Sequence, residues 1–369
     1  MAYVPPPGAW ERLAPERAGF DPRRLAEAVA FAQAHESPWP RSLYLEDGRY
    51  AGTASLDEGP PDDEVLGEVR PRGGPAGLIL RGGRIVAEWG DVARSDMTFS
   101  IAKSYLAVLA GLALEGGLIG SVDEPVRTRV PDLFEAPQNR AITWRHLLQQ
   151  TSEWEGTLFG KADRIDRNRH AGPGVGAKPK GSHRDLGPPG TFWEYNDVRV
   201  NLLALALLHA FRRPLPEVLR EAVMDPIGAT GWDWRGYRNS WVEIDGRPLE
   251  SVSGGAHWGG GMFIPTQSHA RFGLLVQRRG LWGERRLLPE AWLEALREPC
   301  PLNPVYGFLW WLNTERRLYL SAPPGSLFAI GLGTNLIWLD EDLDLVVVAR
   351  WLARDHVDGL LAAVLRSLA

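Results

Sequence analysis

A serine and a lysine stand three positions apart in "TFSIAKSYLAVLAG", residues 98–111, where an apolar helix is expected to begin. Residues at this spacing share one helix face, so the Lys103 side chain can reach back to the Ser100 oxygen. A serine hydroxyl becomes a nucleophile only when a base removes its proton. A helix start adds partial positive charge and free N–H groups that suit a developing oxyanion. The alternative is a capping serine followed by an ordinary surface lysine.

Lysine is rare in this chain, which weakens the surface interpretation of Lys103. It occurs at positions 103, 161, 178 and 180, whereas arginine supplies nearly all other basic residues. A residue type that the chain otherwise avoids is not simple surface decoration when it lies inside an apolar helix. The spacing by itself leaves the nucleophile and the cap as open alternatives.

Four further segments occur in an order that matches a known family. They are "LLQQTSEWEG", "FWEYNDVRVNLLALAL", "GGGMFIPTQSHARFGLL" and "FAIGLGTNLIWLDEDLDLVVVARW". Together with "SIAK", they resemble the serine β-lactamase and penicillin-binding-protein superfamily, in particular its class C-like branch of esterases, D-amino-peptidases and 6-aminohexanoate-dimer hydrolases. The resemblance runs from about Gly77 to Ala369. It favours the catalytic interpretation of the serine and the lysine.

The resemblance implies a role for each matching residue. Ser100 would be the acylated nucleophile, and Lys103 and Tyr195 would share the general-base and general-acid work. The oxyanion hole would consist of the Ser100 backbone N–H and one from the chain near Gly331 or Leu332. The alternative for Tyr195 is a core aromatic at a junction between loop and helix.

The chain departs from the family pattern in two places. Position 197 is aspartate where the Tyr-x-Asn pattern has asparagine, and the alternative role for Asp197 is capping the helix that follows. The third box, normally (Lys/His)-(Thr/Ser)-Gly, reads Ala329-Ile330-Gly331 and lacks a cation. Because that cation helps to bind a substrate carboxylate, its absence favours esters or simple amides over β-lactams.

Other residues are weaker candidates. His257 and Trp258 precede a glycine run in "SGGAHWGGGMF", with a hydrogen-bonded core histidine and a packed tryptophan as the alternative. Trp154, Trp193 and the loop around Phe159 are candidates for the wall of an acyl pocket. No metal or cofactor is expected, because the eight histidines show no HExxH motif and no ligand-like cluster.

The order of the segments predicts an α+β, β-lactamase/transpeptidase-like fold: an antiparallel sheet flanked by helices, with an inserted helical domain. We place an α/β domain at 1–112 and 236–369, its first 75 or so residues partly irregular, and a mainly helical insertion at 113–235. The glycine pair 82–83 predicts a hairpin. "YGFLWWLN" and "RRLYLSA" are predicted strands, residues 155–190 a long loop, and "GPGVGAK" within it a flexible lid segment.

The composition limits the partners and the cellular location that we expect. A formal net charge of -5 gives no indication of a nucleic-acid partner, and one cysteine, Cys300, excludes an intramolecular disulfide. No signal peptide is recognised, and the apolar run 105–114 is too short to cross a bilayer, so we expect a cytoplasmic protein without membrane association. The oligomeric state is not determined by the sequence.

The sequence therefore predicts a serine hydrolase that acts on a small ester or amide through an acyl-enzyme on Ser100. A 6-aminohexanoate-oligomer-type amidase is the first alternative, and a β-lactamase is the next. The alternative of another class is a catalytically silent member of the fold that binds a ligand or a protein.

Overall fold

The computed structural model describes residues 3–130, 132–169, 171, 178–255 and 257–369. The segment "GPGVGAK" therefore lies outside the described residues except for its lysine. The helices are α1 (Pro22–Ala34), α2 (Ala51–Ala54), α3 (Ala102–Glu115), α4 (Trp144–Leu148), α5 (Asp197–Phe211), α6 (Leu215–Leu219), α7 (Thr266–Gln277), α8 (Glu290–Ala295) and α9 (Val357–Arg366). Short 3₁₀ turns include η2 (Phe99–Ile101) and η4 (Asp163–Asp166).

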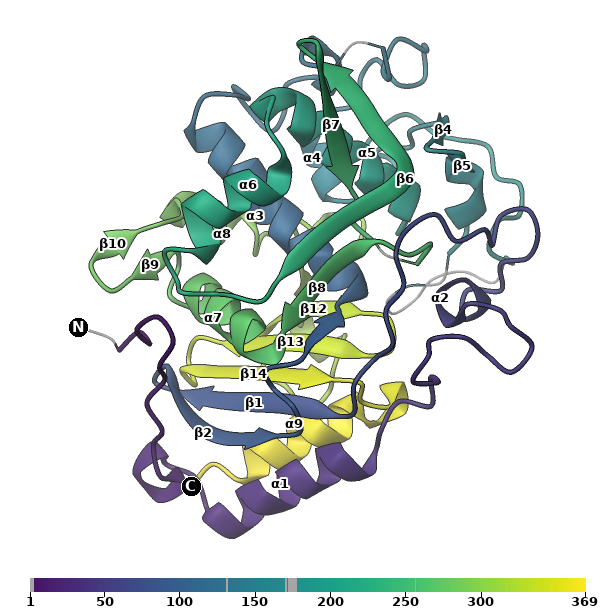
Figure 1. Cartoon of the computed structure of the whole chain (residues 1–369). Helices are drawn as coiled ribbons and strands as arrows, with labels where there is room; N and C mark the ends of the chain where they lie inside the picture. The colour runs from purple at the N-terminus through teal and green to yellow at the C-terminus, as the bar shows by residue number, and fades with distance from the viewer. Residues whose placement is uncertain (1–2, 131, 170, 172–177, 256) are drawn as a thin grey trace.

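A six-stranded antiparallel sheet joins the two ends of the chain, in the order β11-β12-β13-β14-β1-β2. Its strands are β1 (Ala76–Arg81), β2 (Arg84–Trp89), β11 (Trp311–Leu312), β12 (Leu327–Gly331), β13 (Asn335–Asp340) and β14 (Leu345–Arg350). Helix α7 packs on β1, β13 and β14, while α1 and α9 lie side by side below the sheet (Figure 1). The strands β13 and β14 are buried throughout and mostly apolar, with the polar residues Asn335, Asp340 and Arg350 at their ends, because both faces of the sheet are covered.

A second sheet of four strands, in the order β3-β8-β6-β7, lies next to the helices α3 to α6 (Figure 1). Its strands are β3 (Ser95–Met97), β6 (Asp233–Ile244), β7 (Arg247–Val252) and β8 (Gly261–Pro265). Two short hairpins, β4 (Thr157–Leu158) with β5 (Lys161–Ala162) and β9 (Leu281–Trp282) with β10 (Arg285–Arg286), complete the strands of the described residues. Helices α3 and α5 contact each other, which brings the "SIAK" and "YND" segments together.

Most predicted elements are present. The glycine pair 82–83 forms the β1–β2 turn with both φ values positive. Thr143 caps α4: its hydroxyl accepts from the His146 N–H, and its own N–H donates to His146 Nδ1. Residues 155–190 carry only β4, β5 and η4 among the described positions. The strands β6 and β7 were not predicted. The division into domains stays a prediction.

Two predicted strands need correction. "RRLYLSA" is not a strand, and "YGFLWWLN" contributes only the two residues of β11. The buried amide of Asn313 accepts from the N–H groups of Leu318 and Tyr319 and donates to the carbonyls of Tyr319 and Ala322. Since this side chain satisfies the backbone of the segment, a sheet ladder is not needed.

In the described part of the chain, the helices are too short or too polar to cross a bilayer. This agrees with the short apolar run seen in the sequence.

Candidate active site

Ser100 and Lys103 form a buried pair at the start of α3. Lys103 Nζ donates to Ser100 Oγ at 2.7 Å, and the two residues are 6% and 1% exposed. Nζ also faces the Gly254 carbonyl at 3.4 Å. Ser100 lies in the turn η2 directly before α3 and does not cap the helix with its side chain. The geometry thus agrees with the catalytic interpretation of the spacing and not with a simple cap.

The backbone before Ser100 is held in an unusual conformation. Phe99 has φ +51°, a left-handed value that is uncommon outside glycine. Its ring is packed edge-on between Trp39 at 5.5 Å and Trp351 at 6.2 Å. The buried guanidinium of Arg350 donates to the carbonyls of Asp96, Met97 and Ile264, which fixes strand β3. Packing and hydrogen bonds together therefore fix the direction in which Ser100 points.

The end of β12 lies against the same turn. A Cβ placed on Gly331 would come within 2.1 Å of the Thr98 carbonyl oxygen, so only glycine fits there. The contact brings Gly331 and the following Leu332 beside the nucleophile segment. This is the neighbourhood that the sequence predicts for the second oxyanion donor.

Tyr195 is buried beside Lys103. Lys103 Nζ lies 4.8 Å from the centre of the Tyr195 ring, and the Arg169 guanidinium carbon lies 4.9 Å from it. The ring stacks on Trp311 at 5.6 Å and meets Tyr306 edge-on at 6.1 Å. Tyr195 is therefore both packed among aromatic rings and close to two positive charges.

Trp193 extends this aromatic cluster, whereas the other two predicted wall residues lie elsewhere. The Trp193 ring lies 6.3 Å from Tyr195 and 6.2 Å from Trp311. Trp154 is buried in the core and donates its indole N–H to the Leu133 carbonyl. The Phe159 ring packs on Tyr237 at 6.4 Å.

Asp197 is the carboxylate that contacts Lys103, and it also contacts Arg169 and His257. Helix α5 is capped by Asn196, whose side chain accepts from the Arg199 N–H, so Asp197 is not the cap. Its carboxylate lies 2.6 Å from Lys103 Nζ and 2.8 Å from Arg169 Nη1. Burial raises the pKa of Asp197, but Arg169, Lys103 and His257 outweigh it and hold that pKa well below its usual range.

His257 connects Asp197 to the N-terminal part of the chain. Its Nδ1 lies 2.5 Å from Asp197 Oδ2 and its Nε2 lies 3.0 Å from Glu58 Oε1. Two N–H donors facing two carboxylates require the protonated ring. Burial lowers the pKa of His257, yet the carboxylates of Glu58, Asp166 and Asp197 raise it above its usual value. The Trp258 indole N–H donates to Glu58 Oε2 at 2.8 Å.

The structure adds site residues that sequence reasoning missed. Lys180 Nζ lies 2.6 Å from Glu58 Oε1 and 3.3 Å from Asp166 Oδ1, while Arg169 pairs with Asp166 and Asp197. We call the whole group the nucleophile cluster: Glu58, Lys103, Asp166, Arg169, Lys180, Asp197 and His257. The scarcity of lysine was a signal for Lys180. Glu58, Asp166 and Arg169 come from irregular segments that carry no such signal.

Glu58, Asp166 and His257 have the spacing of metal ligands, with their ligand atoms within 4.8 Å of one another. The Lys180 ammonium already lies against both carboxylates, and the two ring nitrogens of His257 face Asp197 and Glu58, which favours the protonated form that does not bind a cation. The group therefore fits an internal ion-pair network better than a metal site.

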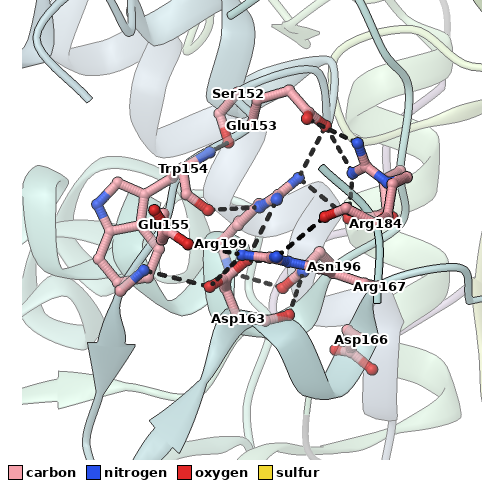
Figure 2. A network of polar contacts seen from close by, with 12 residues as sticks. Ser152, Glu153, Trp154, Glu155, Asp163, Asp166, Arg167, Arg184, Asn196 and Arg199 are labelled. Carbon is pink, nitrogen blue, oxygen red and sulfur yellow. Dashed lines mark hydrogen bonds and ion pairs between the residues drawn. The ribbon is translucent and has the colours of Figure 1, made fainter. Parts of the chain in front are cut away.

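A second buried group of charges lies beside the first. We call it the Arg199 cluster: Glu153, Asp163, Arg167, Arg184, Glu194 and Arg199. Figure 2 shows Arg199 between Glu153 and Asp163, with Arg184 on the outer side of Glu153. Arg184 contacts Glu153 at 2.7 Å and Glu194 at 3.0 Å. Arg199 of α5 pairs with Asp163 and Glu194, and Arg184 pairs with Glu194 and Glu153, so these contacts connect Asp163 and Arg184 to α5.

Comparison with known proteins places this geometry in a family. The sequence model of the Beta-lactamase family matches residues 72–359. This span is well over half of the 369-residue chain, so the protein belongs to the Beta-lactamase family. A search of curated protein sequences gave no match. The predicted β-lactamase/transpeptidase-like α+β fold and the predicted superfamily are both confirmed.

Solved structures show the same fold at low sequence identity. A hydrolase with promiscuous acyltransferase activity, EstCE1, is 16% identical with TM-score 0.60, and the match covers 94% of this chain and 98% of that one. A Bacillus anthracis protein named as a 6-aminohexanoate-dimer hydrolase is 14% identical with TM-score 0.58 (79% and 78% covered). A D-stereospecific amidohydrolase from Streptomyces is 17% identical with TM-score 0.53 (83% and 94% covered).

Proposed function

We propose that this chain is a serine hydrolase that forms an acyl-enzyme on Ser100 and acts on carboxylic esters or linear amides. The observation that carries the proposal is the 2.7 Å hydrogen bond from Lys103 Nζ to Ser100 Oγ at a buried helix start. Burying an ammonium is costly unless it is paired, and Lys103 is paired with the Asp197 carboxylate while it also donates to the Ser100 hydroxyl, so its charge acts directly on the proposed nucleophile.

The contacts assign different tasks to the two predicted proton-transfer groups. Lys103 faces the oxygens of Ser100, Asp197 and Gly254, so its ammonium orients the serine and has no free lone pair. We assign Tyr195, as the phenolate, to accept the serine proton. The Ser100 oxygen then bonds to the substrate carbonyl carbon.

The reaction closes with three further proton transfers, the last of them from Tyr195 back to Ser100. Tyr195 returns its proton to the departing alcohol or amine as the bond from the carbonyl carbon to that group breaks. A water molecule, losing a proton to the same phenolate, attacks the acyl-enzyme. The carboxylic acid leaves and Ser100 recovers its hydrogen.

Negative charge on the carbonyl oxygen needs stabilisation during both steps. The proposed donors are the backbone N–H of Ser100 and one from the chain at Gly331 or Leu332, which the contact with Thr98 supports. The nucleophile cluster adds positive charge, since four cationic side chains meet three carboxylates in it when His257 is protonated.

The missing third-box cation supports esters or linear amides over β-lactams. Structural relatives are named for amide hydrolysis and for acyl transfer, and a 6-aminohexanoate-oligomer-type amidase is the first alternative. A β-lactamase comes next. A silent binding protein would not need the buried Ser100–Lys103 contact, which argues against that class. A cytoplasmic location is part of the proposal and rests on the single Cys300.

Labelling with a fluorophosphonate tests the proposal. Intact-mass spectrometry should show one adduct on wild type and none on Ser100→Ala, and equal labelling of both would remove Ser100 from the mechanism. A parallel assay with a p-nitrophenyl ester, a chromogenic cephalosporin and a linear amide then tests the substrate class. Equal kcat/KM for the cephalosporin and the ester would contradict the preference for esters.

A further inference from the structure

Arg169 is a buried arginine that lies next to the proposed proton-transfer groups. Its side chain is 5% exposed and comes from the loop that follows η4. Nη1 lies 2.8 Å from Asp197 Oδ2 and 3.5 Å from Asp166 Oδ2. The guanidinium carbon lies 4.9 Å from the Tyr195 ring centre. Arg169 thus touches Tyr195 and the carboxylate that pairs with Lys103.

Arg169 offsets the negative charge of Asp197, and Asp197 is one of the two departures of this chain from the family pattern. Asp197 replaces an asparagine and places a negative charge 2.6 Å from Lys103 Nζ. Alone, that carboxylate would cancel the Lys103 ammonium as seen from Ser100 and Tyr195. Arg169 binds the other oxygen of the same carboxylate. The net charge of Asp197 and Arg169 together is then zero, the same as the charge of an asparagine at position 197.

The other charges around Arg169 are already matched. Lys180 lies between Glu58 and Asp166, and His257 lies between Glu58 and Asp197. The third box contributes no cation, because it reads Ala329-Ile330-Gly331. In the described residues that contact Tyr195, positive charge therefore comes from Lys103 and Arg169.

We propose that Arg169 is a positioning residue of the hydrolase, which neutralises Asp197 so that the Lys103 charge acts on Ser100 and Tyr195. This inference rests on the proposed function. It assigns to a loop residue, remote from the sequence motifs, the task of keeping the Lys103 charge available to Ser100 and Tyr195. Because Arg169 already pairs with the buried carboxylates of Asp197 and Asp166, we do not assign it to binding a substrate carboxylate.

Three single variants test the proposal through the pH profile of ester hydrolysis. Arg169→Met removes the charge, so the acid limb of kcat/KM should move to higher pH by about one unit or more. Its kcat near neutral pH should fall about tenfold or more. Arg169→Lys should restore most of both. Arg167→Met is the matched control, because Arg167 comes from the same loop but pairs with Asp163 at 3.0 Å in the Arg199 cluster.

The expected pattern separates catalysis from packing. Arg167→Met should lower Tm and leave the acid limb in place. An acid limb that stays where it was in Arg169→Met, with a fall in Tm like that of the control, would reduce Arg169 to a structural role. The double variant Arg169→Met/Asp197→Asn removes both charges, and its acid limb should return close to that of wild type. A double variant that stays as displaced as Arg169→Met would also overturn the inference.

Failure of the proposed function gives a different result. In that case wild type neither hydrolyses the ester nor reacts with the fluorophosphonate, and no comparison of variants is needed to see it. If wild type is labelled on Ser100 and hydrolyses the ester while Arg169→Met keeps the wild-type profile, the hydrolase stands and only the role of Arg169 falls.

Discussion

The two buried ionic clusters differ in the balance of their charges. In the Arg199 cluster, three arginines meet three buried carboxylates (Figure 2). In the nucleophile cluster, Lys103, Arg169, Lys180 and protonated His257 meet only three carboxylates. A balanced cluster fastens one element to another, whereas an excess of positive charge suits a site where negative charge develops. The comparison predicts separate effects on stability and on catalysis.

The largest expected effect is on stability, from Arg199→Met. This change leaves Glu153 and Glu194 buried with fewer partners, so the free energy of unfolding should fall by about 3–5 kcal/mol. Urea unfolding followed by circular dichroism measures it. The folded fraction should keep the wild-type pH profile. Arg213→Met is the control, because Arg213 pairs with Glu221 on the surface, and its Tm should stay that of wild type.

Tyr195→Phe should show the opposite behaviour. Removing the hydroxyl that transfers the proton should lower kcat about 10²-fold or more. The ring keeps its contacts with Trp311 and Tyr306, so Tm should stay nearly unchanged. Steady-state kinetics measure the change in kcat, and a thermal melt measures the change in Tm. Full activity with a collapsed Tm would make Tyr195 a packing residue and weaken the comparison.

Glu58 links stability to pH within the nucleophile cluster. Burial raises its pKa, but His257 and Lys180 lower it from 4.5 to about 2. A carboxylate with a lowered pKa contributes stability above its unfolded value that is lost as the pH falls through its folded value. Stability should therefore decline between about pH 4.5 and 2. Glu58→Gln should flatten that decline by about 3 kcal/mol in acid unfolding curves, at about 1.36 kcal/mol for each pKa unit between the two values. Parallel curves for variant and wild type would contradict this assignment.

The smallest expected effect is a shift of the pH profile in Asp197→Asn. Losing the carboxylate next to Lys103 raises the local positive charge, so the acid limb of kcat/KM should move toward lower pH. A shift of one pH unit corresponds to about 1.36 kcal/mol. This direction is opposite to that expected for Arg169→Met. An unmoved limb would show that Asp197 has no electrostatic effect on the base, and Lys103 would return as the principal base.

The sequence predicts which main-motif residues meet in the site better than it predicts the charges around them. The spacing of Ser100 and Lys103 predicts their contact because helix geometry fixes neighbours three positions apart. The order of the motifs predicts the fold and puts Tyr195 beside them. The sequence left a role in the site and a role as helix cap open for Asp197, and the structure decides between them: Asn196 is the cap, and Asp197 lies 2.6 Å from Lys103 Nζ.

The errors concern segments without periodicity. "RRLYLSA" has the composition of a strand, yet one buried amide, Asn313, satisfies its backbone. Glu58 and Arg169 lie in loops and Asp166 ends the short turn η4, and no spacing rule indicates which of these charges will meet.

The sequence by itself thus determined the contact between Ser100 and Lys103, the β1–β2 hairpin and the family, since these depend on local periodicity and on ordered motifs. Only the tertiary structure decided which charges surround Lys103. Glu58 comes from the N-terminal segment, Arg169 and Lys180 from the loop after η4, and His257 from the turn before β8. Ion pairs between distant segments follow from the fold as a whole, because the cost of burying each charge is met only when its partners converge.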